Sequence, residues 1–385
     1  MSEQVQQTPE EAVQADAACE TPQAASAGCD APEAARDAQA SAHAADGVAP
    51  ARRHKALVIV VLCVLLAAAF AFSLTLGRYD LDLGTLATML VTAVSGGAVD
   101  VTDANVFLTI RLPRVLVALL VGAALAGAGC AYQGIFKNPM ASPDLLGASA
   151  GACFGAALGI LLSFSSVGIE IAAFVAGIIA VGASWTLSSV IGKRMDGVLV
   201  LVLSGMVVAN LFEAFTSAVK FLADPNSQLP EITFWLMGGL ADARATDAVA
   251  LAIAVAIGTI GLMVLRWRLN VMALGDDEAQ SLGLDVRRTR LAVIVCATLL
   301  TSASVAVAGM VGWVGLIVPH LARFLVGSDN RTLLPASMLL GGTFLLLVDD
   351  VCRCIYTTEI PLTILTAILG APLFVYLICR RKGVT

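Results

Sequence analysis

Long runs without a charged residue constrain this chain more than any other feature. A helix needs about 20 mostly apolar residues to cross the hydrocarbon core of a bilayer. Six uncharged runs of that order occur, at 56–77, 115–136, 145–169, 171–192, 248–265 and 360–379. Backbone N–H and C=O groups in lipid must be satisfied within the protein, so each run is predicted to be a helix. The fold class that follows is an all-α polytopic membrane protein.

Three less regular regions supply four further spans. Residues 197–221 are apolar apart from two charged residues, and residues 332–348 form a short apolar run. The uncharged run 291–319 continues past His320 to Val326 and is too long for one helix. Gly309 and Gly312 offer a turn within it, so it is divided in two. The prediction is ten transmembrane helices per subunit.

The first 50 residues have a different composition from the rest. The whole chain is 58% hydrophobic and 14% charged, whereas a soluble domain carries roughly 25% charged residues. Residues 1–50 hold nine acids and one base, and they have no aromatic residue. Such a segment buries too little apolar surface to offset its ordering entropy. We predict a disordered acidic cytoplasmic tail over 1–50 and a ten-helix membrane domain over 51–385.

The distribution of basic residues predicts the orientation. With ten spans both termini lie on one side, and the loops of that side together with the flanks of the first and last spans carry 16 bases, against six on the other side. The side richer in Lys and Arg is cytoplasmic by the positive-inside rule. Both termini are therefore predicted to be cytoplasmic, in a multi-pass protein of the cell membrane.

A charged loop over 266–290 separates the sixth and seventh spans. Asp276 can cap a short helix there, and Gly283 fits a left-handed terminator. The apolar members of this helix, Ala279 and Leu282, can sit in a shallow groove of another protein. The alternative is an ordinary loop ordered against lipid headgroups.

Two arginines stand at the start of a predicted helix, where they oppose its dipole. Pro113 suits a first helical turn, but Arg111 and Arg114 place positive charge at the positive end of that dipole. Some other partner must favour them. The alternative is that their side chains reach up to lipid headgroups.

Small and polar residues inside the spans suggest packing and pathway roles. Glycines recur at every fourth position on one predicted helix, where they allow another backbone to approach closely, at Gly147, Gly151, Gly155 and Gly159. Glu213 is costly in lipid unless it has a function or a partner. It can face a pathway, pair with Lys220, or lie near the outer interface.

Catalytic and metal-binding motifs are lacking in the sequence. The Gly192-Lys193 pair is followed by Arg194, so it does not form a phosphate-binding loop. Among nine cysteines only Cys352 and Cys354 lie close together, and ordinary packing is favoured over a metal or redox role there. We therefore predict a chain that is not an enzyme and holds no cofactor.

Four blocks together resemble the FecCD-type permeases, membrane subunits of ATP-binding-cassette (ABC) importers for iron-siderophores, haem and cobalamin. The blocks are RLPRVLVALLVGAALAGAGCAYQGIFKNPMASPDLLGASAGA, ALGDDEAQSLGL, GWVGLIVPHLARFLVGSDNRTLLP and EIPLTILTAILGAPLF. The resemblance implies a second permease subunit, identical or a paralogue, around a central pathway. It also implies two cytoplasmic ATPase subunits that bind ATP and magnesium, and an extracytoplasmic substrate-binding protein.

The resemblance also implies roles for particular residues. Arginines that dock the binding protein would be Arg111, Arg114 and Arg353. The coupling helix that contacts the ATPase would use Gly275, Asp276, Glu278, Leu282 and Gly283. Pathway candidates are Ser204, Asn210 and Glu213. The expected cargo is a ferric siderophore, with haem or cobalamin as the alternative within the family and an ion-coupled secondary transporter as the alternative outside it.

Overall fold

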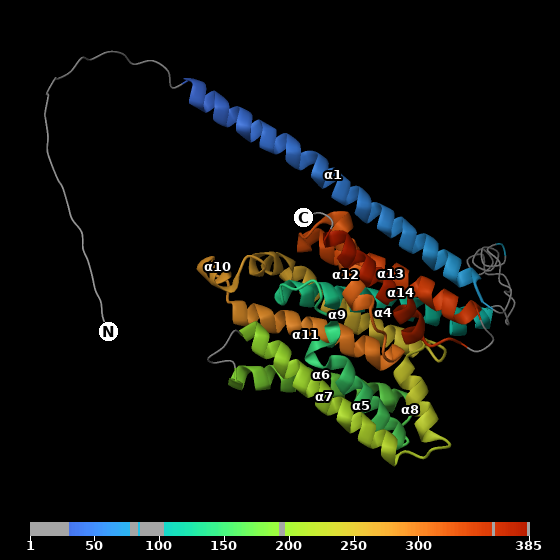
Figure 1. Cartoon of the computed structure of the whole chain (residues 1–385). Helices are drawn as coiled ribbons and strands as arrows, with labels where there is room; N and C mark the ends of the chain where they lie inside the picture. The colour runs from blue at the N-terminus through green and yellow to red at the C-terminus, as the bar shows by residue number, and fades with distance from the viewer. Residues whose placement is uncertain (1–30, 78–83, 85–103, 192–196, 356–358, 383–385) are drawn as a thin grey trace, which may run out of the picture. The chain divides into compact units, whose positions relative to one another are not determined.

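The computed structural model describes residues 31–77, 84, 104–191, 197–355 and 359–382, and these are helical with connecting turns (Figure 1). The α-helices are α1 (Ala31–Thr75), α4 (Leu112–Ile135), α5 (Ala148–Leu161), α6 (Ser166–Ile191), α7 (Gly197–Leu222), α8 (Gln228–Met237), α9 (Ala245–Met272), α10 (Asp276–Ser281), α11 (Val286–Ala308), α12 (Val314–Val326), α13 (Asn330–Cys354) and α14 (Leu362–Lys382). A π-helical segment, η1 (Val106–Arg111), precedes α4, and a 3₁₀ turn, η2 (Pro143–Leu146), precedes α5.

The predicted set of ten apolar helices is confirmed. Seven helical segments in the described part of the chain are long and apolar enough to cross a membrane, and α5, α12 and α14 are shorter apolar helices. The predicted division of the run after residue 291 is also confirmed, because α11 ends at Ala308 and α12 begins at Val314. The short helix α8 was not predicted from the sequence.

Helix α1 begins twenty residues earlier than the boundary expected for a disordered tail. Residues 31–50 are helical, and they are rich in alanine, the residue with the highest helix propensity. The membrane-crossing part of α1 is Arg53–Thr75. Residues 1–30 lie outside the described residues, so for them the disordered tail stays a prediction.

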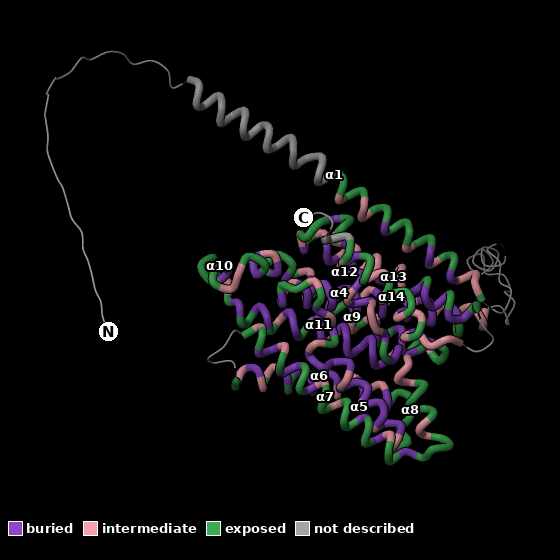
Figure 2. Tube along the Cα trace, viewed as in Figure 1, coloured by how far each residue is buried: buried purple, intermediate pink, exposed green. Residues whose placement is uncertain are grey.

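Helix α4 lies at the centre of the packed helices. In the most apolar window of the η1–α4 segment 78% of the residues are buried, against 17% for α1 and 28% for α6 and for α7. It packs against α9, α11, α12 and α13, and the buried residues gather around it (Figure 2). Close approach depends on glycine at two points, because a Cβ at Gly122 would meet the carbonyl oxygen of Gly341 and a Cβ at Gly129 would meet that of Gly315.

Two of the ten helices are too short to cross a bilayer alone. Helices α5 and α12 have 14 and 13 residues, which is about 20 Å at 1.5 Å per residue, whereas the hydrocarbon core is about 30 Å thick. The expected span 145–169 is therefore wrong in its bounds. Gly147, with a φ of 81°, ends η2 before α5 begins, and a turn after Leu161 separates α5 from α6.

The four glycines of the predicted stripe do not all share one helix. Gly151 and Gly155 face α6, where a Cβ on Gly151 would lie 2.6 Å from the carbonyl oxygen of Ala176. Gly159 faces the start of the same helix. Gly147 instead precedes α5, and a Cβ there would lie 3.3 Å from the backbone nitrogen of Ala209 on α7. The close contact between α5 and α6 therefore rests on three of the four.

The helices meet in polar clusters at two ends. At the arginine end α1 ends, α4 begins, α13 ends and α14 begins. At the α10 end α4 and α9 end, α10 lies, and α11 begins. Each end contains arginines and aspartates, and the two ends differ in burial.

Candidate functional site

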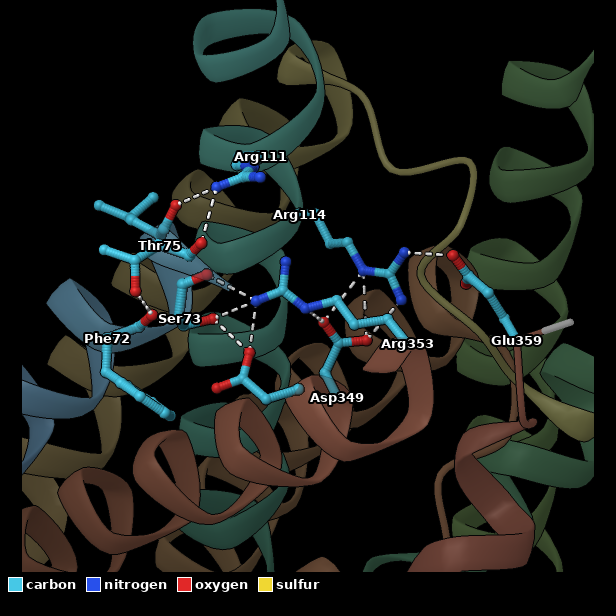
Figure 3. Close-up of polar contacts among 10 residues, drawn as sticks. Phe72, Ser73, Thr75, Arg111, Arg114, Asp349, Arg353 and Glu359 are labelled. Carbon is cyan, nitrogen blue, oxygen red and sulfur yellow. Dashed lines mark hydrogen bonds and ion pairs between the residues drawn. The ribbon is translucent and has the colours of Figure 1, made fainter. Parts of the chain in front are cut away.

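Arg111 closes the junction between α1 and α4 at the arginine end. Its Nη1 donates to the carbonyl oxygens of Leu74 and Thr75, at 2.7 and 3.1 Å (Figure 3). Those carbonyls belong to the last turn of α1, where the helix leaves them without an internal partner. The guanidinium of one helix thus satisfies the end of another.

Arg114 pairs with two carboxylates from other parts of the chain. Its Nη2 and Nε donate to the two oxygens of Asp349 at 2.8 and 3.0 Å, and its Nη1 donates to Oε1 of Glu359 at 2.7 Å (Figure 3). Two parallel bonds to one carboxylate are the strong geometry for a guanidinium. The pair joins the first turn of α4 to the last part of α13.

Arg353 completes the same cluster from α13. Its Nη2 donates to the backbone oxygen of Ser73 at 2.6 Å, to Ser73 Oγ at 2.9 Å and to Asp350. The hydroxyl of Ser73 in turn donates to Asp350 at 2.6 Å. Among the described residues, this cluster contains three arginines and three carboxylates, so their formal charges balance.

These contacts answer why α4 carries arginines at its positive end. The carboxylates of Asp349 and Glu359 supply the missing partner, and Arg111, Arg114 and Arg353 are only 4–8% exposed. The three arginines lie at the same end of the protein, as their grouping in the sequence analysis implies. Their described hydrogen bonds are made to other groups of this chain. The expected docking bonds to a binding protein would have to break these internal bonds first.

Helix α10 at the other end is short and bounded by two glycines. Gly275, with a φ of 154°, precedes Asp276, and a Cβ there would meet the carboxylate of Glu278. Gly283 has a φ of 80°, as expected of a left-handed terminator. The sequence therefore fixes both ends of α10 by positions that favour glycine.

Asp276 does not cap α10 as predicted, because its side chain bonds elsewhere. One oxygen accepts from Lys137 Nζ at 3.0 Å and the other from Arg290 Nη2 at 2.7 Å. Burial alone would raise the pKa of this carboxyl, but the bonds from Arg290 and Lys137 outweigh burial and hold the pKa below its ordinary value. Asp276 thus links α10 to the end of α4 and to the start of α11, which we call the Asp276 fork.

The surface of α10 differs from the prediction at one residue. Ala279 is fully buried within this chain, because α10 packs against α9 and α11. Leu282 is 65% exposed, and Leu274, which the sequence analysis missed, is 67% exposed. Glu278 is also exposed. Two large leucines and an acid therefore remain available to another protein.

The three pathway candidates on α7 do not share one face. Asn210 and Glu213 are exposed, whereas Ser204 is buried. Ser204 and Glu213 are nine residues apart, which places them on opposite sides of a helix at 3.6 residues per turn. A pathway along the exposed face of α7 includes Asn210 and Glu213 and leaves out Ser204.

Metal binding finds no support in the part of the chain that the structure describes. No group of three or more His, Cys, Asp or Glu side chains could hold an ion there. Cys352 is buried and Cys354 is exposed, and neither forms a disulfide. The burial of Cys352 fits the packing interpretation, whereas the exposure of Cys354 does not.

Comparison with known proteins identifies the class. The family model of the FecCD transport family matches residues 65–380. The chain therefore belongs to the FecCD transport family. It is the permease component of an ABC importer, a multi-pass membrane protein that is not itself an enzyme. Membership rules out the ion-coupled secondary transporter considered as an alternative.

Individual relatives differ in the cargo that their names give. The molybdate import system permease protein of Haemophilus influenzae is 37% identical over 84% of this chain and 96% of its own length. A probable iron chelatin transport system permease of Helicobacter pylori is 40% identical over 72% of this chain and 84% of its own. A solved structure of a metal-chelate type ABC transporter in an inward-facing conformation matches with a TM-score of 0.76 and 37% identity, over 84% of this chain and 99% of that one.

Proposed function

We propose that this permease carries an iron complex from an extracytoplasmic binding protein into the cytoplasm. The α10 end then faces the cytoplasm and both termini lie there, in the cell membrane. The partners are a second permease subunit, identical or a paralogue, two ATPase subunits that hold ATP and magnesium, and the binding protein. This chain itself holds no cofactor.

The observation that carries the proposal is the surface of α10. Leu274 and Leu282, which flank this helix, are exposed, and the Asp276 fork ties the helix to the end of α4 and to α11. A partner that binds the two leucines can therefore move α4, the central helix of the permease. ATP drives the cycle by binding one conformation of the assembly more tightly than the other.

Exposed leucines on α10 allow a direct test of the coupling role. Leu282→Asp places a charge on the surface expected to enter the ATPase, so transport per ATP hydrolysed should fall about tenfold or more in proteoliposomes. Leu162→Asp, an exposed leucine in the turn between α5 and α6, is the matched control. Equal coupling in Leu282→Asp and wild type would contradict the proposal.

The cargo route follows the exposed face of α7 with Asn210 and Glu213, where a second subunit completes the pathway. A carboxylate on this wall repels a dianionic oxyanion and tolerates a neutral or cationic chelate. This favours an iron chelate over molybdate, the second candidate, which the Haemophilus influenzae relative supports.

Uptake assays separate the two cargoes. Cells that depend on this importer should accumulate a neutral radiolabelled ferric hydroxamate, and they should not accumulate radiolabelled molybdate. Glu213→Gln should leave ferric hydroxamate uptake within a few-fold of wild type. Molybdate uptake without ferric hydroxamate uptake would overturn the choice of cargo while leaving the importer assignment in place.

The binding protein is proposed to dock at the arginine end. Glu359, whose side chain is 35% exposed, lies at the rim of the buried cluster. In this proposal the three arginines keep the docking surface in its folded shape. An arginine that bonds directly to the binding protein would first give up one of its bonds within this chain.

A further inference from the structure

A cavity of about 330 Å³ lies at the α10 end, between the end of α4, the loop that follows it and α12. The function proposed above makes no use of it. Its walls are formed by Gln133, Lys137, Asn138, Pro139, His320, Arg323 and Phe324.

The polar side of the cavity carries positive charge. Lys137 and Arg323 are cations, and none of the seven described lining residues is acidic. Cationic N–H donors that converge on one space favour a group with negative charge and several acceptor oxygens. The chemistry of the wall therefore selects an oxyanion.

Bonds within the wall hold part of this arrangement in place. Arg323 Nη2 donates to Gln133 Oε1 at 3.1 Å, and Gln133 Nε2 donates to the backbone oxygen of Leu316 at 3.0 Å. The ring of His320 packs edge-on against Phe324, with 5.2 Å between ring centroids. Because the guanidinium is already positioned, a ligand there would not have to order it.

Size and surroundings narrow the class of ligand. About 330 Å³ is at the lower end of small-molecule sites, so a phosphate-sized group with a short extension fits. Phe324 is exposed and Pro139 is partly exposed, which gives the cavity an apolar flank. Basic pockets between helices at a membrane surface bind lipid headgroups, so such a group can come from a free anion or from a phospholipid.

We propose that this cavity binds a phosphate-like oxyanion, carried by a free anion or by a phospholipid headgroup. Lys137 is shared, because its Nζ also lies 3.0 Å from Asp276 Oδ1 of the Asp276 fork. An oxyanion in the cavity competes with Asp276 for Lys137 and loosens α10 from the end of α4. The binding itself does not depend on the proposed function, and only its effect on coupling rests on it.

The free-anion source is tested by calorimetric titration of inorganic phosphate into the full-length chain in a maltoside detergent, which carries no phosphate group. Saturable binding should weaken about tenfold or more in Lys137→Gln and in Arg323→Gln, since each removes a charge-assisted bond. Asp276→Asn should bind phosphate several-fold more tightly, because Lys137 is then free of its carboxylate. Lys220→Gln, a lysine in the last turn of α7, is the control and should bind as wild type.

The lipid source is tested by mass spectrometry of phospholipids that copurify with the full-length chain from its native membrane. If phosphate does not bind, an anionic phospholipid retained by wild type and by Lys220→Gln, but lost in Lys137→Gln, supports the proposal. Lys137→Gln decides the case if Arg323→Gln fails to fold, because the Lys137 side chain is a third exposed. Neither kind of binding, or binding equal in wild type and Lys137→Gln, would overturn it.

Discussion

The two ends of α4 use the same chemistry in opposite surroundings. At the arginine end Asp349 has a side chain 1% exposed and holds Arg114 by two bonds. At the α10 end Asp276 has a side chain 33% exposed and divides its oxygens between Lys137 and Arg290. Water can replace the partners of the second aspartate and cannot reach the first. Burial therefore makes the arginine cluster rigid, whereas partial exposure leaves the Asp276 fork able to open.

Removing Asp349 from the arginine cluster should give the largest loss of stability. Asp349→Ala leaves Arg114 buried with Glu359 as its remaining carboxylate, and a buried charge that loses its partner costs about 3–5 kcal/mol. The free energy of unfolding in detergent, followed by tryptophan fluorescence, should fall by that amount.

Glu359→Gln is the matched control at the same guanidinium. The side chain of Glu359 is partly exposed, so its change should cost about 1 kcal/mol or less. Equal losses for the two variants would contradict the idea that burial sets the strength of this cluster.

Packing of the central helix should give the next largest effect. Gly129→Ala places a Cβ against the carbonyl of Gly315 on α12, and overpacking of this kind costs about 1–3 kcal/mol. Gly182→Ala on α6 is the control, because a Cβ there has nothing within 4 Å. Thermal unfolding should separate the two variants, and a stable Gly129→Ala would show that α4 and α12 can move apart without cost.

The Asp276 fork should contribute less to stability than the arginine cluster. Asp276→Asn should lower the free energy of unfolding by about 1 kcal/mol or less at neutral pH, because a partly exposed pair is screened by water. The pKa of the carboxyl is lowered in the folded protein, so its contribution is present above the ordinary value of 3.8 and is lost as pH falls through the lowered pKa. Unfolding curves of wild type and Asp276→Asn should therefore converge at acid pH, and a difference that grows on acidification would contradict this sign.

The smallest effect is expected from an exposed pair in the same loop. Arg288 and Asp285 lie 3.1 Å apart, with side chains 89% and 53% exposed. Arg288→Gln should change the thermal unfolding midpoint too little to measure, since exposed pairs contribute little. A loss as large as that in Asp276→Asn would show that exposure does not rank these pairs.

The helices could be predicted from the sequence, whereas the partners of the arginines within this chain could not. Apolar runs report burial in lipid, which depends on composition alone, so the ten helices could be counted. The partners of Arg114 lie more than 230 positions further along the chain, and no local pattern connects them. The family resemblance groups Arg111, Arg114 and Arg353, but the partners that it implies for them belong to another protein.

The α10 region shows the same division. Gly283 marked the end of the short helix, because backbone conformation is a local property. The side chain of Asp276 was assigned to a cap, although tertiary partners on α4 and α11 compete for it more strongly. Leu274 was missed since it lies outside the helix, where no periodic pattern applies.

Movement of the α10 end is best followed as the amount of cargo transported per ATP hydrolysed. This ratio is measured in proteoliposomes that contain the permease, its ATPase and its binding protein, with wild type, Asp276→Asn and Gly182→Ala. We expect Asp276→Asn to keep ATP hydrolysis and to lose several-fold in this ratio, whereas Gly182→Ala, whose new Cβ has nothing within 4 Å, should match wild type. An unchanged ratio of cargo to ATP in Asp276→Asn would contradict the claim that the α10 end moves during transport.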